Sequence, residues 1–216
     1  MQATRFGVAI DMPAGPSEVA VIAGASCVPA FVAADLLSQA EHGPDSQVIL
    51  AATSRRVIDE VLAEVDRQMA VLPRRGTAAA ALSNSKAFLV AGMQEAVDLM
   101  NEYAPEHLIV ATERAEEVAG MITNAGSVFI GNYSCESAGD YASGTNHTLP
   151  TNGYARAFSG VSTASFMKTI TFQQLTAEGI KNLGPIVETM ASAENLEAHK
   201  RAISIRLAAL GGGDDV

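Results

Sequence analysis

Short apolar runs alternate with segments of helical periodicity through the first three quarters of the chain. The runs at 19–23, 47–52, 86–92, 107–112 and 126–131 are apolar almost throughout, which is typical of strands buried on both faces of a sheet. The segments between them carry apolar residues three or four positions apart, as helices do. Strands separated by single helices predict an α/β domain with a mostly parallel sheet.

Two of the expected helices have recognisable ends. Pro29 opens the first helix at its first turn, and Gly43-Pro44 ends it. Ser54 or Thr53 is expected to cap the second. The apolar positions of that second helix keep the helical period over a long stretch, at 57, 58, 61, 62, 65, 69 and 72.

The pattern changes after the fifth apolar run. Residues 131–160 are rich in Gly, Ser, Asn and Thr and show no periodicity, and a loop of that length in a compact domain is usually functional. Beyond it we expect three elements: a strand at 168–173 and helices at roughly 174–192 and 194–210. The sequence therefore predicts an α/β domain over residues 1–161 and a small, mainly helical tail domain over residues 162–216.

Composition excludes several classes of protein. The 216 residues are 48% apolar and 18% charged, as in ordinary globular proteins. A net charge of −10 without a block of Lys and Arg argues against binding nucleic acid. The uncharged stretch 19–34 is interrupted by glycine, serine and proline, so we expect no membrane span. Cys27 and Cys135 lack metal or disulfide spacing, which suits a reduced, cytoplasmic setting.

Two pairs of residues could carry chemistry. Gln39 and His42 lie three positions apart at the end of a predicted helix and share one face, so they could bind a metal; alternatively His42 bonds local carbonyls and Gln39 is solvated. Glu106 and His107 could act as general base and proton shuttle, or they could be a solvated loop pair. This second pair precedes its strand, whereas ligands in open parallel sheets gather at the carboxyl ends.

Other candidates are more scattered. The long loop supplies Glu136, Asp140 and His147, and Asp140 would suit a hard metal ion. In the tail, Glu194 and His199 could be ordinary residues of a surface helix. No glycine-rich nucleotide fingerprint, P-loop, nucleophile elbow or HExxH motif is present. Spacing alone thus indicates a metal site assembled from distant segments.

Five separated motifs, in one order, resemble the histidinol dehydrogenase family. They are "DMPAGPSEV", "DLLSQAEHGPDSQVIL", "YAPEHLIV", "GSVFIGNYSCESAGDYASGTNHTLPT" and "ENLEAHKRAISIRL". The resemblance runs from about residue 8 to residue 210. It implies an incomplete Rossmann-like sheet and an enzyme that oxidises L-histidinol to L-histidine through an aldehyde, using two NAD molecules and zinc.

The resemblance also implies roles for individual residues. Glu106 would activate a water, and His107 would be the principal base. The positions that match zinc ligands are Gln39, His42, Asp140 and His199. With the zinc itself, the positions expected to hold the substrate are Ser17, His107, His147 and Glu194, besides the zinc ligands.

The sequence departs from the family in length, because it resembles only the C-terminal half. The NAD-binding residues would lie in the absent half, so we expect the isolated chain to be inactive, with an exposed sheet edge or apolar face. The family is a homodimer in which Glu194 and His199 reach the partner's zinc, and a separate N-terminal chain could complete the enzyme. Two alternatives stay open: a zinc- and small-molecule-binding module without redox activity, and a zinc hydrolase using Glu106.

Overall fold

The chain divides into two compact units, Met1–Met167 and Lys168–Val216, and each is described by itself. The computed structural model describes residues 15–211 together with residues 7, 10, 12 and 13. The boundary lies after Met167, whereas the sequence pattern set the division after residue 161. Residues 212–216 of the expected tail domain lie outside the described residues.

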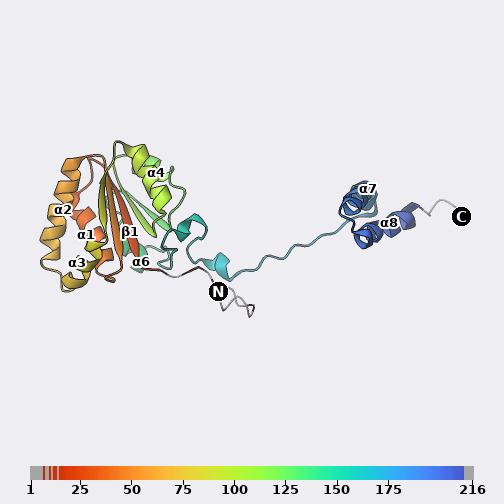
Figure 1. Ribbon diagram of the computed structural model, residues 1–216, viewed down its shortest axis with the longest axis horizontal. Coiled ribbons are helices and arrows are strands. Elements are labelled where there is room, and N and C mark those ends of the chain that lie inside the picture. The colour runs from red at the N-terminus through yellow and green to blue at the C-terminus, as the bar shows by residue number, and fades with distance from the viewer. Residues whose placement is uncertain (1–6, 8–9, 11, 14, 212–216) are drawn as a thin grey trace. The chain divides into compact units, whose positions relative to one another are not determined.

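The first unit is built on a five-stranded sheet in which every strand pairing is parallel (Figure 1). The order across the sheet is β3-β2-β1-β4-β5, which places β1 in the centre. The predicted α/β architecture with a parallel sheet is confirmed. The strands are β1 (Glu18–Ala23), β2 (Gln47–Ala52), β3 (Lys86–Leu89), β4 (His107–Ala111) and β5 (Ser127–Ile130).

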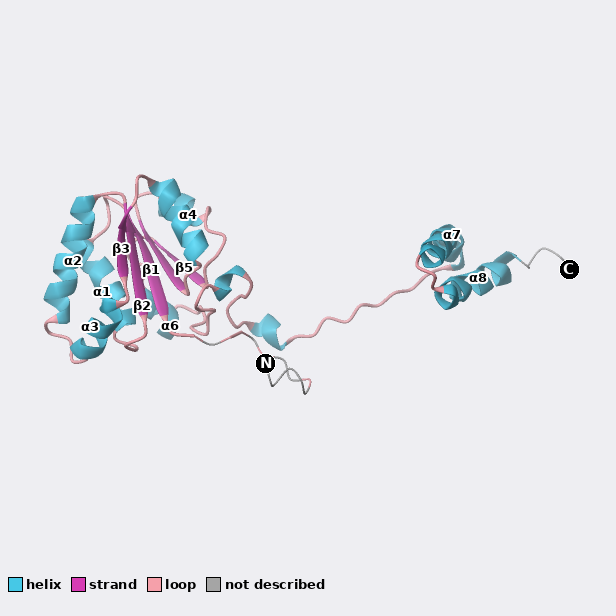
Figure 2. Ribbon diagram, in the orientation of Figure 1, coloured by secondary structure: helices cyan, strands magenta, loops and turns pink. Residues whose placement is uncertain are grey.

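Helices cover both faces of this sheet (Figure 2). Alternate residues of β1 serve the two faces: Val19 and Val21 belong to one core cluster, Ala20 and Ile22 to the other. This alternation explains why the whole strand is apolar. The first cluster is shared with α1 (Pro29–Ala40), α2 (Arg55–Met69) and α3 (Arg75–Ser83), and the second with α4 (Met93–Tyr103) and α5 (Ala115–Ala119).

Several local expectations were wrong or incomplete. α3 was not predicted, because its alanine-rich sequence has weak amphipathic periodicity and buries only Ala78 and Ala81. Leu72, assigned to the second helix, lies in the turn after α2 ends at Met69. Ser54 is the N-cap residue of α2, as expected, but its side chain forms no capping hydrogen bond. The loop at 131–160 contains the short helix α6 (Glu136–Tyr141).

The second unit is a pair of helices, α7 (Ala177–Ala193) and α8 (Glu197–Gly211). The strand expected at 168–173 is absent from the described structure, where this segment is irregular. Its alternating apolar residues find no neighbouring strand, and Phe172 is 92% exposed. No helix in the described part of the chain combines the length and apolar character that a membrane span requires.

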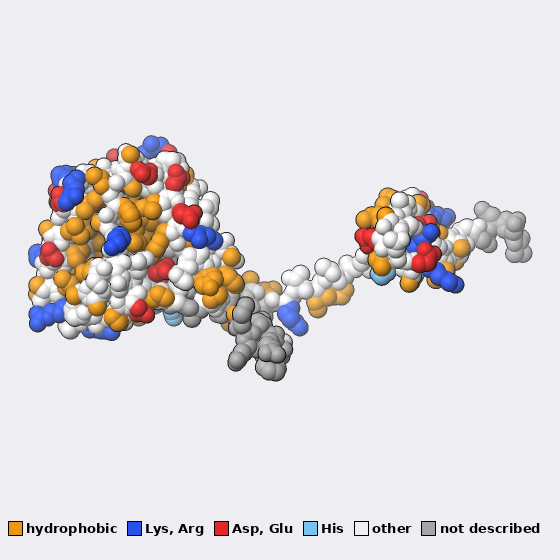
Figure 3. All heavy atoms as spheres, in the orientation of Figure 1, with side chains coloured by type: hydrophobic (Ala, Val, Ile, Leu, Met, Phe, Trp, Pro, Cys, Tyr) orange, Lys and Arg blue, Asp and Glu red, His pale blue; other side chains and the backbone are white. Residues whose placement is uncertain are grey.

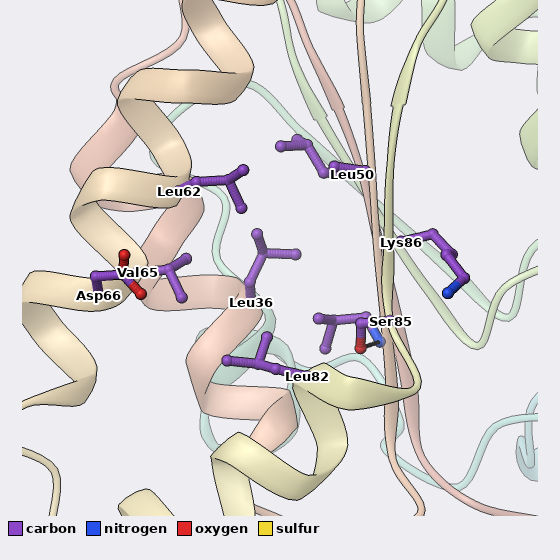
Figure 4. Close-up of a pocket in the computed structure, with 10 residues that line it drawn as sticks. Leu36, Leu50, Leu62, Val65, Asp66, Leu82, Ser85 and Lys86 are labelled. Atoms are coloured by element: carbon purple, nitrogen blue, oxygen red, sulfur yellow. Dashed lines mark hydrogen bonds between the residues drawn. The ribbon is translucent and has the colours of Figure 1, made fainter.

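β3 forms an edge of the described sheet and borders an apolar groove. All four of its residues are exposed, and hydrophobic side chains gather on the face over this strand (Figure 3). Beside it lies a cavity of about 320 Å³, into which Leu36, Leu62 and Leu82 point while Lys86 extends away (Figure 4). The described sheet thus has an exposed edge, as expected for a chain that resembles only half of the family's length.

The fully buried Ile22 provides a test of the core. Ile22→Ala should lower the free energy of unfolding by about 2–5 kcal/mol, because the cavity between β1 and the helices cannot collapse fully. Urea denaturation measures this change. The control Val71→Ala, at a side chain that is 82% exposed, should shift it by less than about 0.5 kcal/mol. Equal effects of the two substitutions would contradict this description of the core.

Candidate functional site

Buried polar side chains gather at the edge of the sheet where the parallel strands begin. Glu18 opens β1 and His107 opens β4, and these strands pair with Val19 opposite His107. α1 connects the parallel strands β1 and β2, so it returns to this amino edge and ends there beside α6. The buried polar members of the group are Glu18, Gln39, Glu106, His107 and Glu136.

The backbone of β1 fixes the orientation of the His107 imidazole. Its Nδ1 lies 3.1 Å from the backbone carbonyl oxygen of Glu18, and because a carbonyl only accepts, Nδ1 carries the proton. Nε2 is buried and forms no hydrogen bond, although Oδ1 of Asp140 lies 3.4 Å away. Burial lowers the pKa of His107, and its ring stacks on Phe129 with centroids 5.9 Å apart. Nε2 can therefore accept a proton or bind a cation.

Glu106 lies beside this imidazole and is held by the same residue of β1. Its Oε2 accepts a hydrogen bond of 2.8 Å from the backbone N–H of Glu18 and lies 3.7 Å from Nδ1 of His107. Burial, with the charges of Glu18 and Asp140, raises the pKa of Glu106 to about 8. A carboxyl with a pKa in this range can exchange protons near neutral pH.

Glu136 of α6 faces Gln39 of α1. Both are 1% exposed. The Gln39 amide is assigned with its nitrogen toward Glu136, where it donates to Oε1 and Oε2 at 2.6 and 3.2 Å; the opposite orientation would set the amide oxygen against the ionised carboxylate. Burial and the charges of Asp140, Asp35 and Glu106 raise the pKa of Glu136 to about 9.

The donor set of this region suits a divalent cation. Ligand atoms of His107, Glu136 and Asp140 all lie within 4.8 Å of one another. His42, at the exposed end of α1, directs Nδ1 to the carbonyl of Ser38 at 2.9 Å, which leaves its Nε2 available. Several carboxyl groups lie in the same buried region as the unpaired Nε2 of His107. A bound cation would offset the repulsion between the carboxylates. Nitrogen and oxygen donors of these types fit zinc.

The structure brings together some of the residues singled out from the sequence. Gln39, Glu106, His107 and Asp140 meet at the amino edge, with His42 at the end of α1. Ser17 is half-buried beside Glu18, and the exposed His147 lines a cavity of about 290 Å³ with Glu106. Glu194 and His199 are exposed residues of the second unit.

Sequence reasoning did not assign a role to Glu18 or Glu136. A carboxylate opening the apolar run "EVAVIA" was a signal for Glu18, since a buried strand seldom begins with an unpaired acid. For Glu136 the signal was its spacing of four from Asp140, which places both on one side of a helix. This spacing is informative only if the segment is helical, and its loop-like composition did not predict the short helix α6.

Comparisons with known proteins agree on one family. The family model for histidinol dehydrogenase matches residues 1–207. Histidinol dehydrogenase of Bacteroides thetaiotaomicron is 63% identical over 200 residues, covering 93% of this chain and 47% of the relative, and that of Haemophilus influenzae is 56% identical over 209 residues, covering 97% and 49%. The chain thus spans about half the length of these curated relatives.

A solved structure is also closely similar. The crystal structure of histidinol dehydrogenase from Elizabethkingia anophelis superposes with a TM-score of 0.95 and 58% identity. It covers 98% of this chain, and the match takes in 49% of the solved chain.

The buried carboxyl groups make the stability of the metal-free protein depend on pH. The pKa of Glu106 is raised to about 8 and that of Asp35 to about 7, from 4.5 and 3.8. The folded state therefore binds more protons, and stability present at pH 4 should be lost as pH rises towards 8. Urea denaturation across this range should show the decline.

Substitutions at Glu106 and Asp35 test whether these two carboxyl groups cause the decline in stability. Glu106→Gln and Asp35→Asn should each flatten the decline, because neither amide titrates. Glu116→Gln, at an exposed carboxyl of α5, is the control and should leave the slope as it is. A stability that rises over this pH range in the metal-free protein would contradict the pKa directions.

Proposed function

The chain belongs to the histidinol dehydrogenase family, and we propose that it forms the zinc- and substrate-binding part of an enzyme that oxidises L-histidinol to L-histidine with NAD. The observation that carries the proposal is the buried pair Glu106 and His107, both fixed by the backbone of Glu18, with Asp140 3.4 Å from His107. The family resemblance implies a functional role for each of these residues. The reaction is an NAD-dependent oxidation of an alcohol and then an aldehyde.

The zinc ion would be held by Gln39, His42 and Asp140, with His199 of the partner subunit as a fourth ligand. When bound, zinc supplies a positive charge and open coordination positions for the imidazole and amine nitrogens of the substrate. Gln39 comes from the last turn of α1, His42 from the turn that follows this helix, and Asp140 from α6. Ser17, His147 and Glu194 would complete the binding of L-histidinol.

His107 would be the base of each oxidation. Because Nδ1–H is directed to the carbonyl of Glu18, Nε2 is the atom that takes the hydroxyl proton as hydride leaves the neighbouring carbon. NAD, when bound, accepts that hydride. Burial lowers the pKa of His107, which favours the neutral imidazole that a base requires.

Glu106 would act between the two oxidations. Its carboxylate takes a proton from the water that adds to the aldehyde carbon, giving the hydrate that loses the second hydride. A cation bound nearby would favour the charged form of Glu106 and so lower its pKa from about 8. The hydrogen bond from the Glu18 N–H stabilises the same form.

The NAD contacts are proposed to lie in the half of the family's length that this chain does not span. The tail residues Glu194 and His199 would reach the zinc of a partner chain in a homodimer. Cys27 and Cys135 are free thiols, which is compatible with the proposed cytoplasmic setting.

A second candidate is a zinc- and small-molecule-binding module without redox chemistry. It is favoured by the presence of all four proposed zinc ligands in a sequence that has no nucleotide-binding fingerprint. This module would bind zinc and histidinol but would not reduce NAD under any condition.

Zinc binding should depend on His42. His42→Ala should weaken zinc binding at least about 10-fold, because the free Nε2 is lost from the ligand set. Competition with a chromophoric chelator measures the dissociation constant, and Glu41→Gln at the neighbouring position is the control. An unchanged zinc affinity would remove His42 from the site.

Activity should depend on Glu106 and His107 but zinc content should not. We would join this chain to the preceding half of the Bacteroides thetaiotaomicron relative and follow NADH formation from L-histidinol. Glu106→Gln and His107→Asn should each reduce the rate by about 10²–10⁴-fold and leave zinc bound.

The chain alone should form no NADH in the same assay. Turnover by the chain alone would contradict the proposal that the NAD contacts lie in the half that this chain does not span. No turnover by the joined protein would favour the binding module, and loss of zinc from Glu106→Gln or His107→Asn would contradict their assignment to chemistry.

A further inference from the structure

Glu136 is a buried acid for which the proposed reaction gives no role. It is 1% exposed, and none of the ion pairs in the described part of the chain involves it. The charged groups that influence it are Asp140, Asp35 and Glu106, all of them acidic. Burying a carboxyl among other carboxyls is costly, so packing alone does not explain why this position holds a glutamate.

The contact that Glu136 does make is with Gln39. When the Gln39 amide is assigned with its nitrogen facing Glu136, that nitrogen donates to the two carboxyl oxygens at 2.6 and 3.2 Å. An amide has a donor end and an acceptor end, and only its oxygen can bind a cation. Fixing the nitrogen on Glu136 directs the oxygen away from the carboxylate.

We propose that Glu136 is a positioning residue that orients the Gln39 amide so that its oxygen, not its nitrogen, is presented to the metal. This inference rests on the proposed zinc site. Glu136 and Asp140 lie one turn apart in α6, so one side of this helix supplies both a ligand and the group that orients another ligand. α6 thereby links the last turn of α1 to the amino edge of the sheet.

The competing role for Glu136 is direct ligation. Its carboxylate lies within 4.8 Å of ligand atoms of His107 and Asp140, so distance alone permits this. In the assigned orientation both oxygens of Glu136 accept from the Gln39 amide, and this contact favours the orienting role. The two roles differ in whether Glu136 matters once Gln39 is gone.

A double-mutant cycle on zinc affinity separates the roles. Glu136→Leu should weaken zinc binding by the 10- to 100-fold typical of residues that orient metal ligands. Glu136→Gln, which keeps an acceptor oxygen, should stay within a few-fold of the unaltered chain. In a Gln39→Ala background, Glu136→Leu should have no further effect. Ser137→Ala, exposed on the same helix, is the matched control.

A second measurement does not need zinc. In the metal-free protein, the side-chain amide of Gln39 should show a downfield proton that exchanges slowly in ¹⁵N-resolved NMR spectra. Glu136→Leu should abolish this signature and Glu136→Gln should preserve it. Circular dichroism of each variant reports whether it is folded.

The outcomes distinguish a failure of the orienting role from a failure of the zinc site. If zinc binds and depends on His42 but Glu136→Leu changes nothing, the orienting role is wrong while the zinc site stands. If Glu136→Leu weakens zinc binding equally with and without Gln39, Glu136 is a ligand. If the unaltered chain binds no zinc, the zinc site is wrong and the orienting role toward a metal is wrong with it, whatever the amide signal shows.

Discussion

The backbone of Glu18 is the point on which the arrangement of the site depends. Its N–H donates to Glu106, and its carbonyl accepts from Nδ1 of His107. Both contacts follow from the parallel register of β1 and β4, which sets Val19 opposite His107. A shift of one residue would turn His107 to the other face of the sheet. Sheet register thus fixes which imidazole nitrogen is free.

This site lies at the amino edge of the sheet, opposite the edge where open parallel sheets usually bind ligands. The strands begin with polar residues there, and α1 and α6 close over them. The consequence is a group of carboxyl groups with little access to water, and burial raises the pKa of Glu106 and Glu136 above neutral. A bound cation would make such an arrangement more favourable, in agreement with the proposed metal site.

Much of the fold could be predicted from sequence, because buried parallel strands are apolar on both faces and "QVILAA" coincides with β2. The pair Gln39 and His42 was visible as a helical spacing of three, but its meaning depended on the family resemblance. Local composition could not reveal α3 or α6, whose sequences lack an amphipathic stripe. Nor could it reveal that Glu136 faces Gln39, since that contact joins segments nearly a hundred positions apart. The prediction of a strand at 168–173 was wrong because alternating apolar residues do not form a strand without a neighbouring strand to pair with.

The most direct test of the central claim is a crystal structure of the zinc-loaded chain with anomalous scattering recorded at the zinc edge. We expect an anomalous peak about 2.0–2.2 Å from the Gln39 oxygen, His42 Nε2 and an Asp140 oxygen, with the Gln39 nitrogen still on Glu136. A peak bound instead by His107, Glu136 and Asp140, with Gln39 outside the coordination sphere, would contradict the assignment of the metal site.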